Sequence, residues 1–231
     1  QVFIEQAEGK GRLHICYGES EEEALDMENC TNFDCLEVDA QTPRQLCGSQ
    51  AFAMRYLFVR SDPGVRYREV YAASQFLPIK NRGSFFSSDK LFNQIYNISV
   101  RTLHLNTREF FLDGIKRDRW VWSGDATQSY LLDFYSFFDI EVCKRTIRFL
   151  RGADPVTCHI NTIQDYTLYW FISLYDYYLY TGDRGFIHEI YGSAKTLMDS
   201  FCLPQTDAQG FLQAQPCDWV FVDWAQIPGL C

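Results

Sequence analysis

The chain has 231 residues, of which 47% are hydrophobic and 16% aromatic, and its formal net charge is −9. This length and apolar content predict a packed core in one large or two modest domains, and they exclude disorder as the main state. The negative charge, without a basic patch, argues against nucleic acid and anionic membrane surfaces as partners.

The N-terminal third is predicted to be β-structure. Three segments alternate between apolar and polar residues, and turn residues separate them: 12–17, 51–59 and 65–71. The acidic run from Glu19 to Glu23 is interpreted as a solvated loop.

From about residue 85 the apolar residues recur at helical spacing. The first helix is expected to begin after an N-cap at Ser87 or Ser88 and to end near Leu105. Four more helices are predicted at 126–138, 140–151, 162–181 and 184–201. Strands followed by helical hairpins predict an α+β fold with two domains in series, 1–84 and 85–231.

The helix at 162–181 is apolar and aromatic on nearly every side, which predicts that it is buried. A membrane span is excluded because Gln164, Asp165 and Asp176 interrupt it. Gly182 is expected to end it at the C′ position.

Nine cysteines and four histidines are present. The cysteines show no Cys-x-x-Cys pair and no metal-ligand spacing with the histidines, so a zinc site is not expected. An odd number of cysteines cannot pair completely within the chain, and several lie in apolar runs that predict buried thiols.

The densest group of charged and aromatic residues is the signature stretch, residues 113–125. It holds the carboxylates of Asp113, Asp118 and Asp125 beside two tryptophans. Carboxylates accept hydrogen bonds from hydroxyl groups, and indole faces cover the C–H surface of a sugar ring. The stretch therefore indicates a pocket for a neutral, polyhydroxylated ligand.

A purely structural interpretation of the same residues remains open. Asp125 is placed to cap the following helix, with Gln128 as a capping-box partner. Asp118 lies between two arginines and could form a surface ion pair. Asp113 precedes a glycine, which is typical of a turn.

The pattern Asp113, Arg117-Asp118-Arg119, Trp122 and Gly124-Asp125 resembles the signature of the bacterial α-L-rhamnosidase family of inverting glycoside hydrolases. The similarity extends over residues 85–225 and, loosely, over 1–80. It implies a β-sandwich segment followed by part of an (α/α)6 six-hairpin barrel, and a carbohydrate partner such as a rhamnose-containing glycan. It also implies hydrolysis without a metal or other cofactor.

The resemblance also implies roles for single residues. Asp118 takes the place of the general acid, where the family usually has glutamate, one methylene longer. Asp113 and Asp125 would hydrogen-bond sugar hydroxyls, and Trp122 would pack against the ring. Further substrate-binding positions are Arg117, Trp170, Asp223 and Trp224.

An inverting enzyme needs a second carboxylate as general base. In the family this base comes from a later part of the barrel, and the only glutamates after Asp125 are Glu141 and Glu189, in predicted helices without a site signature. Six helical hairpins take on the order of 300 residues. The chain is therefore expected to hold the first half of the barrel, with exposed apolar flanks that favour a homo-oligomer or poor solubility.

Two other functions stay open. One is a different (α/α)6 carbohydrate enzyme, such as an α-glucosidase-like enzyme or a uronyl hydrolase. The other is a non-catalytic carbohydrate-binding or interaction module.

Overall fold

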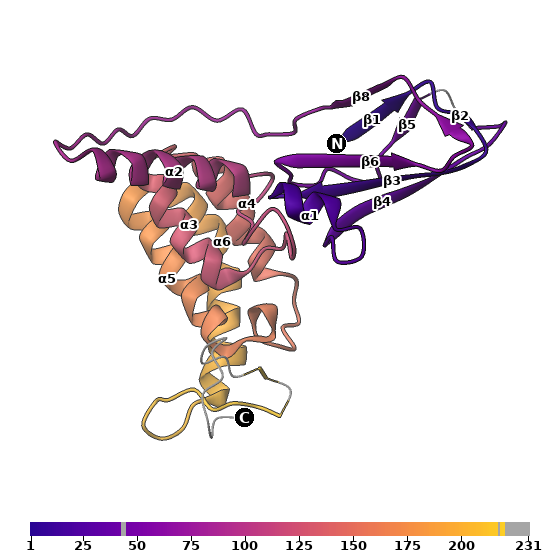
Figure 1. Ribbon diagram of the computed structural model, residues 1–231. Coiled ribbons are helices and arrows are strands. Elements are labelled where there is room, and N and C mark those ends of the chain that lie inside the picture. The colour runs from indigo at the N-terminus through magenta and orange to yellow at the C-terminus, as the bar shows by residue number, and fades with distance from the viewer. Residues whose placement is uncertain (43–44, 217, 220–231) are drawn as a thin grey trace, which may run out of the picture. The chain divides into compact units, whose positions relative to one another are not determined.

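A computed structural model describes residues 1–42, 45–216 and 218–219. The chain forms two compact units (Figure 1). The β unit comprises Gln1–Phe76 together with Gly114–Arg119, and the helical unit comprises Leu77–Asp113 and Trp120–Cys231. The N-terminal segment of the β unit thus ends before residue 84, and a second segment of this unit comes from the signature stretch.

The β unit contains two three-stranded antiparallel sheets and a small ribbon. One sheet has the order β5 (Gln45–Cys47), β1 (Val2–Glu5), β8 (Glu69–Ala72), and the other has the order β4 (Asn32–Val38), β3 (Gly11–Gly18), β6 (Tyr56–Ser61). The ribbon pairs β2 (Glu8–Gly9) with β7 (Val65–Arg66). Side chains of β1 and β3, among them Ile4 and Ile15, share one buried cluster. The sheets therefore pack around a common core, as expected of a sandwich segment.

Strand β4 was not predicted from the sequence, because its polar residues point into the core and an apolar residue points outward. Asn32 and Asp34 point inward and are buried, whereas Phe33 is 62% exposed. The buried carboxylate of Asp34 accepts a hydrogen bond from the Tyr17 hydroxyl at 2.6 Å and one from the Ser49 amide at 3.2 Å. These bonds satisfy a polar group that would otherwise be costly to bury.

The acidic run is a short helix rather than a loop. Helix α1 (Glu21–Leu25) is capped by the Ser20 hydroxyl, which accepts from the Glu23 amide at 3.2 Å. Glutamates in a first helical turn interact favourably with the helix dipole, so acidic residues here favour a helix start.

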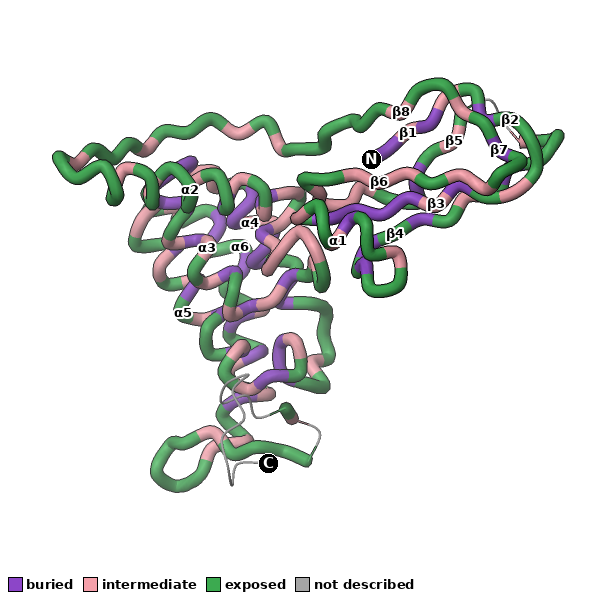
Figure 2. Tube along the Cα trace, viewed as in Figure 1, coloured by how far each residue is buried: buried purple, intermediate pink, exposed green. Residues whose placement is uncertain are grey.

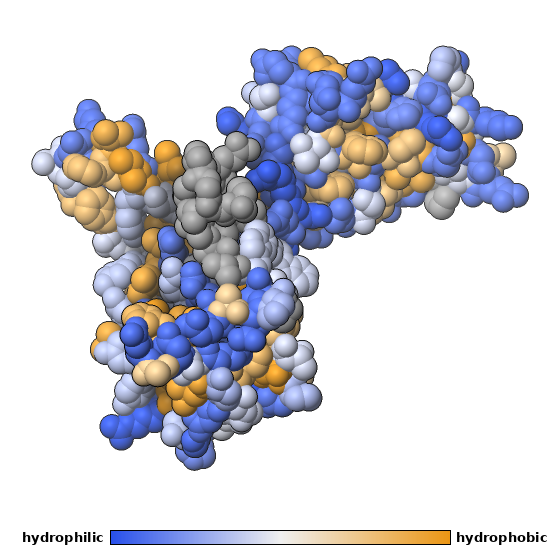
Figure 3. All heavy atoms as spheres, turned by 90° about the horizontal axis from the view of Figure 1, so that it is seen from below, coloured by the Kyte–Doolittle hydropathy of each residue, from blue (hydrophilic) through white to orange (hydrophobic). Residues whose placement is uncertain are grey.

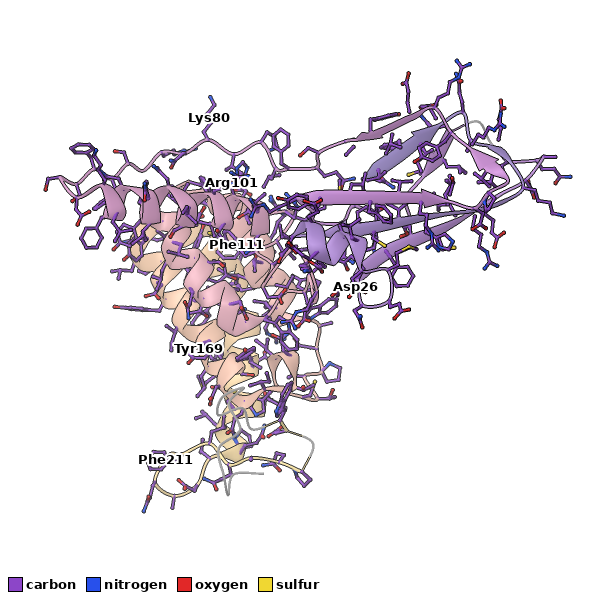
Figure 4. The ribbon with its side chains drawn as sticks, viewed as in Figure 1. Asp26, Lys80, Arg101, Phe111, Tyr169 and Phe211 are labelled. Atoms are coloured by element: carbon purple, nitrogen blue, oxygen red, sulfur yellow. The ribbon has the colours of Figure 1, made fainter. Side chains whose placement is uncertain are left out.

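The helical unit has a helix at each predicted position. These are α2 (Lys90–Asn106), α3 (Ser123–Tyr135), α4 (Ile140–Arg151), α5 (Gln164–Thr181) and α6 (Arg184–Thr196), followed by a π-helical turn at Leu197–Cys202 and 3-10 turns at Ile160–Thr162 and Leu203–Gln205. Their core includes Phe111, labelled in Figure 4, which is 1% exposed. None of the described helices combines the length and apolarity that crossing a bilayer requires.

Helix α2 begins one or two residues later than predicted. The N-cap is Asp89, whose Oδ1 accepts from the Leu91 amide at 2.8 Å. The Ser87 hydroxyl oxygen instead accepts a hydrogen bond from the Asp89 amide, at 3.2 Å. The predicted caps at Ser87 and Ser88 are therefore wrong.

Helix α5 is not buried on every side. Its buried residues are Thr167, Trp170, Ser173 and Tyr177, which lie on one face. Tyr175 and Leu179 are 65% and 63% exposed. Exposed apolar residues also lie on α2, where Figure 2 shows most of the helix in green, and Figure 3 shows apolar atoms at the surface of the helical unit. The expected exposure of apolar flanks is thus present, and self-association stays a prediction.

Asp183 joins α5 to α6. Gly182 ends α5 with φ 64°, and the Asp183 carboxylate accepts from the Phe186 amide at 3.0 Å and the Tyr177 hydroxyl at 2.8 Å. The Lys144 Nζ atom lies 2.9 Å from the Asp183 Oδ2 atom. The Phe186 amide, together with Lys144 and Tyr177, lowers the pKa of Asp183 from 3.8 to about 2.

Replacing Asp183 by asparagine is expected to reduce the stability of the helical unit at neutral pH. Asparagine is also a good N-cap, so the substitution removes mainly the charge. Because the folded pKa lies below the unfolded value, the stabilisation is present above about pH 4 and is lost as the pH falls through about 2. We expect a difference of about 1–2 kcal/mol above pH 4 that disappears at the acid end. Urea unfolding of both proteins across this pH range measures it; a pH-independent difference would contradict it.

Candidate functional site

A cavity of about 640 Å³ lies in the helical unit. All of its lining residues belong to that unit, on α2, α3, α5 and the segment before α3: Ile98, Ser99, Thr102, Leu103, Asn106, Leu112, Asp113, Gly124, Asp125, Thr127, Gln128, Ser129, Leu132, Asp165, Tyr166 and Tyr169. This volume is in the range of small-molecule sites, about 300–1,000 Å³.

The described lining combines carboxylates with apolar and aromatic side chains. Asp113, Asp125 and Asp165 supply acceptors, and none of the described lining residues is a lysine or an arginine. Leucine and isoleucine side chains supply apolar surface, and Tyr166 and Tyr169 supply aromatic surface. Such a lining suits a neutral ligand that carries both hydroxyl groups and C–H surface.

Asp113 is held at the cavity by the backbone of Trp120. The Asp113 Oδ1 accepts from the Trp120 amide at 2.9 Å, and the Asp113 amide donates to the Trp120 carbonyl at 3.0 Å. The turn predicted at Asp113 is therefore a wider loop, closed by this pair of residues. One carboxylate oxygen of Asp113 is used in the closure, and the same residue lines the cavity.

Asp125 is not the N-cap of α3. The cap position is Trp122, which makes no capping hydrogen bond with its side chain, and Asp125 lies within the first turn. Asp183, which also follows a glycine, does cap its helix. The structural interpretation of Asp125 as a cap is therefore wrong, and this residue lines the cavity instead.

Trp122 does not line the cavity but contacts a residue that does. Its ring meets the Tyr166 ring edge-on, with centroids 6.2 Å apart and an interplanar angle of 79°. Burial, together with the negative charge of Asp125, raises the pKa of Tyr166. The phenol therefore stays protonated near neutral pH and can donate a hydrogen bond.

The close approach between α3 and Tyr166 requires a glycine. A Cβ atom on Gly124 would lie 2.8 Å from the Tyr166 ring. The Ser123 hydroxyl donates to the Tyr166 carbonyl at 2.7 Å, and the Thr127 hydroxyl lies 2.9 Å from that of Ser173. Small polar residues on α3 thus bring the two helix starts together at the cavity.

Asp118 and Arg117 belong to the β unit, as part of Gly114–Arg119. Lys116 in this loop pairs with Glu23 at 2.8 Å, and the Lys116 carbonyl accepts from Asn32 Nδ2 at 3.2 Å. Arg119 donates to Gln50 Oε1 at 2.8 Å. These contacts anchor the loop on both sides of Asp118.

The ion pair that the structural interpretation gave to Asp118 does not form among the described residues. Arg119 lies over the Phe52 ring, 5.3 Å from its centroid, and donates to the Ala51 carbonyl. Among the described residues, no hydrogen bond or ion pair engages the Asp118 carboxylate, which is exposed. The neighbouring arginine is therefore committed to other partners.

Trp170 is a core residue rather than a pocket wall. Its side chain is 0% exposed, and its indole N–H donates to the Ile147 carbonyl at 2.9 Å. A ring without exposed surface cannot cover a sugar, so the predicted contact is wrong. Asp223 and Trp224, the other predicted wall residues, lie outside the described residues.

Both candidate glutamates have cationic partners. Glu189 receives two hydrogen bonds from Arg148, at 2.7 Å and 2.9 Å, and Glu141 lies 3.3 Å from Lys144. Neither residue lines the cavity. Their ion pairs support the expectation that neither is the general base.

On helix α5 the predicted wall residue, Trp170, directly follows Tyr169, which does line the cavity. Tyr166 and Tyr169 line the cavity, whereas Trp170 is buried. Successive residues of a helix point about 100° apart, so Tyr169 faces the cavity while Trp170 faces the core. The i, i+4 spacing of Asp165 and Tyr169 was the available signal, but it does not state which face lies toward the cavity.

Comparison with protein families gives two matches. The bacterial alpha-L-rhamnosidase 6 hairpin glycosidase domain matches residues 80–229. The family described as alpha-rhamnosidase-like, bacteroidetes, N-terminal matches residues 2–59. No curated protein sequence matches the chain.

Solved structures of rhamnosidases are similar in fold. A GH78 family rhamnosidase of Bacillus sp. GL1 aligns with a TM-score of 0.77 and 23% identity, over 98% of this chain and 25% of the other. For a rhamnosidase from Klebsiella oxytoca with rhamnose bound, the TM-score is 0.68 and the identity 23%, over 96% and 50%. For an alpha-L-rhamnosidase from Dictyoglumus thermophilum the TM-score is 0.61 and the identity 16%, over 94% of this chain and 28% of the other.

The chain thus spans between 25% and 50% of the length of these solved structures. The match to the glycosidase domain covers more than half of the chain. This chain therefore belongs to the bacterial α-L-rhamnosidase family, with β-sheets followed by part of the six-hairpin glycosidase domain.

Proposed function

We propose that this chain carries the sugar-binding and acid-bearing part of an inverting glycosidase that acts on terminal α-L-rhamnosides or related glycosides. The observation that carries the proposal is the position of Asp113 and Asp125. These two carboxylates of the signature stretch line one cavity of suitable size in the glycosidase domain. A family relative from Klebsiella oxytoca was solved with rhamnose bound.

The lining favours a deoxy sugar over an acidic one. Rhamnose is neutral and carries a methyl group, which fits apolar residues such as Ile98 and Leu132 beside hydroxyl-accepting carboxylates. A uronate would bring a negative charge next to Asp113, Asp125 and Asp165, without a lysine or arginine in the described lining. Like charges at close range are unfavourable, so the lining disfavours the uronyl hydrolase alternative.

In the proposed reaction Asp118 donates a proton to the leaving glycosidic oxygen. Water attacks the anomeric carbon from the opposite face, assisted by a carboxylate that acts as general base. Asp113 and Asp125 hold hydroxyl groups of the sugar and thereby orient the anomeric carbon. Glu141 and Glu189 are both paired with cations, which argues against either of them as this base.

Binding of rhamnose to the chain tests the site without requiring turnover. Asp125→Asn is expected to weaken binding about 10-fold or more, because a hydrogen bond to a charged group contributes about 1.5–3 kcal/mol. Asp113→Asn is expected to act in the same direction while keeping an oxygen for the Trp120 amide. Titration followed by NMR, with glucose and glucuronate as comparison sugars, measures the affinities.

A matched control is Asp199→Asn. Asp199 is an exposed residue of the π-helical turn that pairs with Lys195 and is absent from the cavity lining. It should leave rhamnose binding unchanged. Equal affinities of all the variants would refute the site, and tighter binding of glucuronate than of rhamnose would favour the uronyl hydrolase alternative. Binding without hydrolysis by the complete protein would favour the non-catalytic module.

A further inference from the structure

The start of helix α3 is capped by a residue distant in sequence. Trp122 occupies the cap position without a capping hydrogen bond from its own side chain. The Asn161 Oδ1 accepts from the Ser123 amide at 2.9 Å, and the Asn161 Nδ2 donates to the Val121 carbonyl at 3.1 Å. One amide side chain thus binds the backbone on both sides of Trp122.

The backbone at Asn161 has an uncommon conformation. Asn161 has φ 54° and ψ 21°, and the next residue, Thr162, has φ 63°. Asparagine tolerates the left-handed region, but for a β-branched threonine it is strained. Such residues persist only where surrounding contacts hold them. Here the Thr162 amide donates to the His159 carbonyl at 2.8 Å, and the Ile160 amide donates to Thr167 Oγ1 at 2.9 Å.

The two segments joined by Asn161 both supply cavity residues. Gly124 and Asp125, in the first turn of α3, directly follow the backbone that Asn161 binds. Tyr166, in the first turn of α5, lies five residues after Asn161. The Ser123 hydroxyl adds a second link, to the Tyr166 carbonyl at 2.7 Å. The position of one cavity wall relative to the other therefore depends on these bonds.

We propose that Asn161 is a positioning residue of the sugar site: its amide holds the backbone around Trp122 so that Asp125 and Tyr166 face the same cavity. The inference rests on the proposed function of that cavity. Asn161 does not line the cavity itself, so it acts through Ser123 and its neighbours rather than by contact with the sugar.

Asn161→Gly tests the proposal, because glycine adopts the positive φ without strain while both side-chain hydrogen bonds are lost. We expect the affinity for rhamnose to fall about 10-fold and hydrogen exchange of the Ser123 amide to accelerate by at least a similar factor. Asn161→Asp keeps an acceptor for the Ser123 amide and tolerates the same φ, so it should restore part of both properties. NMR of the whole chain measures exchange and binding in the same samples.

Asn93 provides a matched control within the helical unit. Its side chain also makes two backbone hydrogen bonds, accepting from the Ser87 amide and donating to the Ser87 carbonyl, both at 2.8 Å. Asn93 is absent from the cavity lining. Asn93→Ala should therefore change neither rhamnose affinity nor the exchange of Ser123, even if it lowers stability.

The outcomes separate this inference from the proposed function. If the unsubstituted chain binds rhamnose and folded Asn161→Gly binds it equally well, Asn161 is not a positioning residue. If the unsubstituted chain binds no sugar, the proposed function fails, and with it the sugar-site part of the inference. Hydrogen exchange of the Ser123 amide then tests the remaining part. Unchanged exchange in Asn161→Gly would show that the Asn161 side chain does not hold the backbone around Trp122. Should Asn161→Gly not fold, the same comparisons with Asn161→Asp decide, with a smaller expected effect.

Discussion

Asp118→Asn is expected to lower the turnover number of the complete protein that carries this chain by about 10²–10⁴-fold, the usual contribution of general acid–base catalysis. Asparagine has nearly the same shape as aspartate but has no proton to donate to a leaving oxygen. The loop around Asp118 should keep its conformation, because its anchoring contacts are made by Lys116 and Arg119. Substrate affinity should change much less than turnover.

The leaving group distinguishes an acid from a residue that merely supports the site. An aryl rhamnoside whose phenol is strongly acidic departs without protonation, so Asp118→Asn should lose far less activity on it than on an alkyl rhamnoside. Asp118→Glu should retain more activity than Asp118→Asn, since it still carries a proton. Asp199→Asn serves as the control with unchanged kinetics. Asp118 would not be the general acid if Asp118→Asn lost equal activity on both substrates, or if its turnover of the alkyl rhamnoside were unchanged.

Trp170→Ala is expected to destabilise the helical unit by about 3–5 kcal/mol, the range for removing a large buried aromatic side chain. Trp170 is completely buried, and its loss also removes the hydrogen bond to the Ile147 carbonyl. The milder Trp170→Phe keeps most of the buried ring area and loses the N–H donor. We expect it to cost about 1–2 kcal/mol.

Far-ultraviolet circular dichroism during urea unfolding measures this loss, because it reports mainly on the helical unit. Trp120→Ala is the matched control, since Trp120 is 52% exposed and its bonds to Asp113 come from backbone atoms. That substitution should cost about 1 kcal/mol or less. A core role for Trp170 also predicts that folded Trp170→Phe binds rhamnose normally. If Trp170→Phe bound rhamnose more weakly but were as stable as the unsubstituted chain, Trp170 would be a sugar-contacting residue after all.

Local pattern predicted much of the helical unit. The spacing of apolar residues placed helices α2 to α6 within a few residues, and Gly182 ends α5 as expected. These features depend on residues close together in the sequence, whose helical preference and periodicity act locally. In the β unit the pattern was less informative, because β4 turns Asn32 and Asp34 inward and Phe33 outward.

The candidate site was only partly visible in the sequence. The density of carboxylates and indoles indicated the signature stretch, and Asp113 and Asp125 do line one cavity. The same pattern could not separate Trp122 from Trp170, one beside a cavity residue and the other in the core. Burial of a side chain depends on which helix faces pack together, and that is set by the whole unit.

By itself, the amino-acid sequence determined the order of helices α2 to α6, the signature stretch and the resemblance to the family, because these are encoded in neighbouring residues. Only the tertiary structure decided that Asp125 is not a cap, that Gly114–Arg119 belongs to the β unit, and that Asn161 caps α3. Each of these depends on hydrogen bonds or packing between residues far apart along the chain, which no local pattern of residues contains.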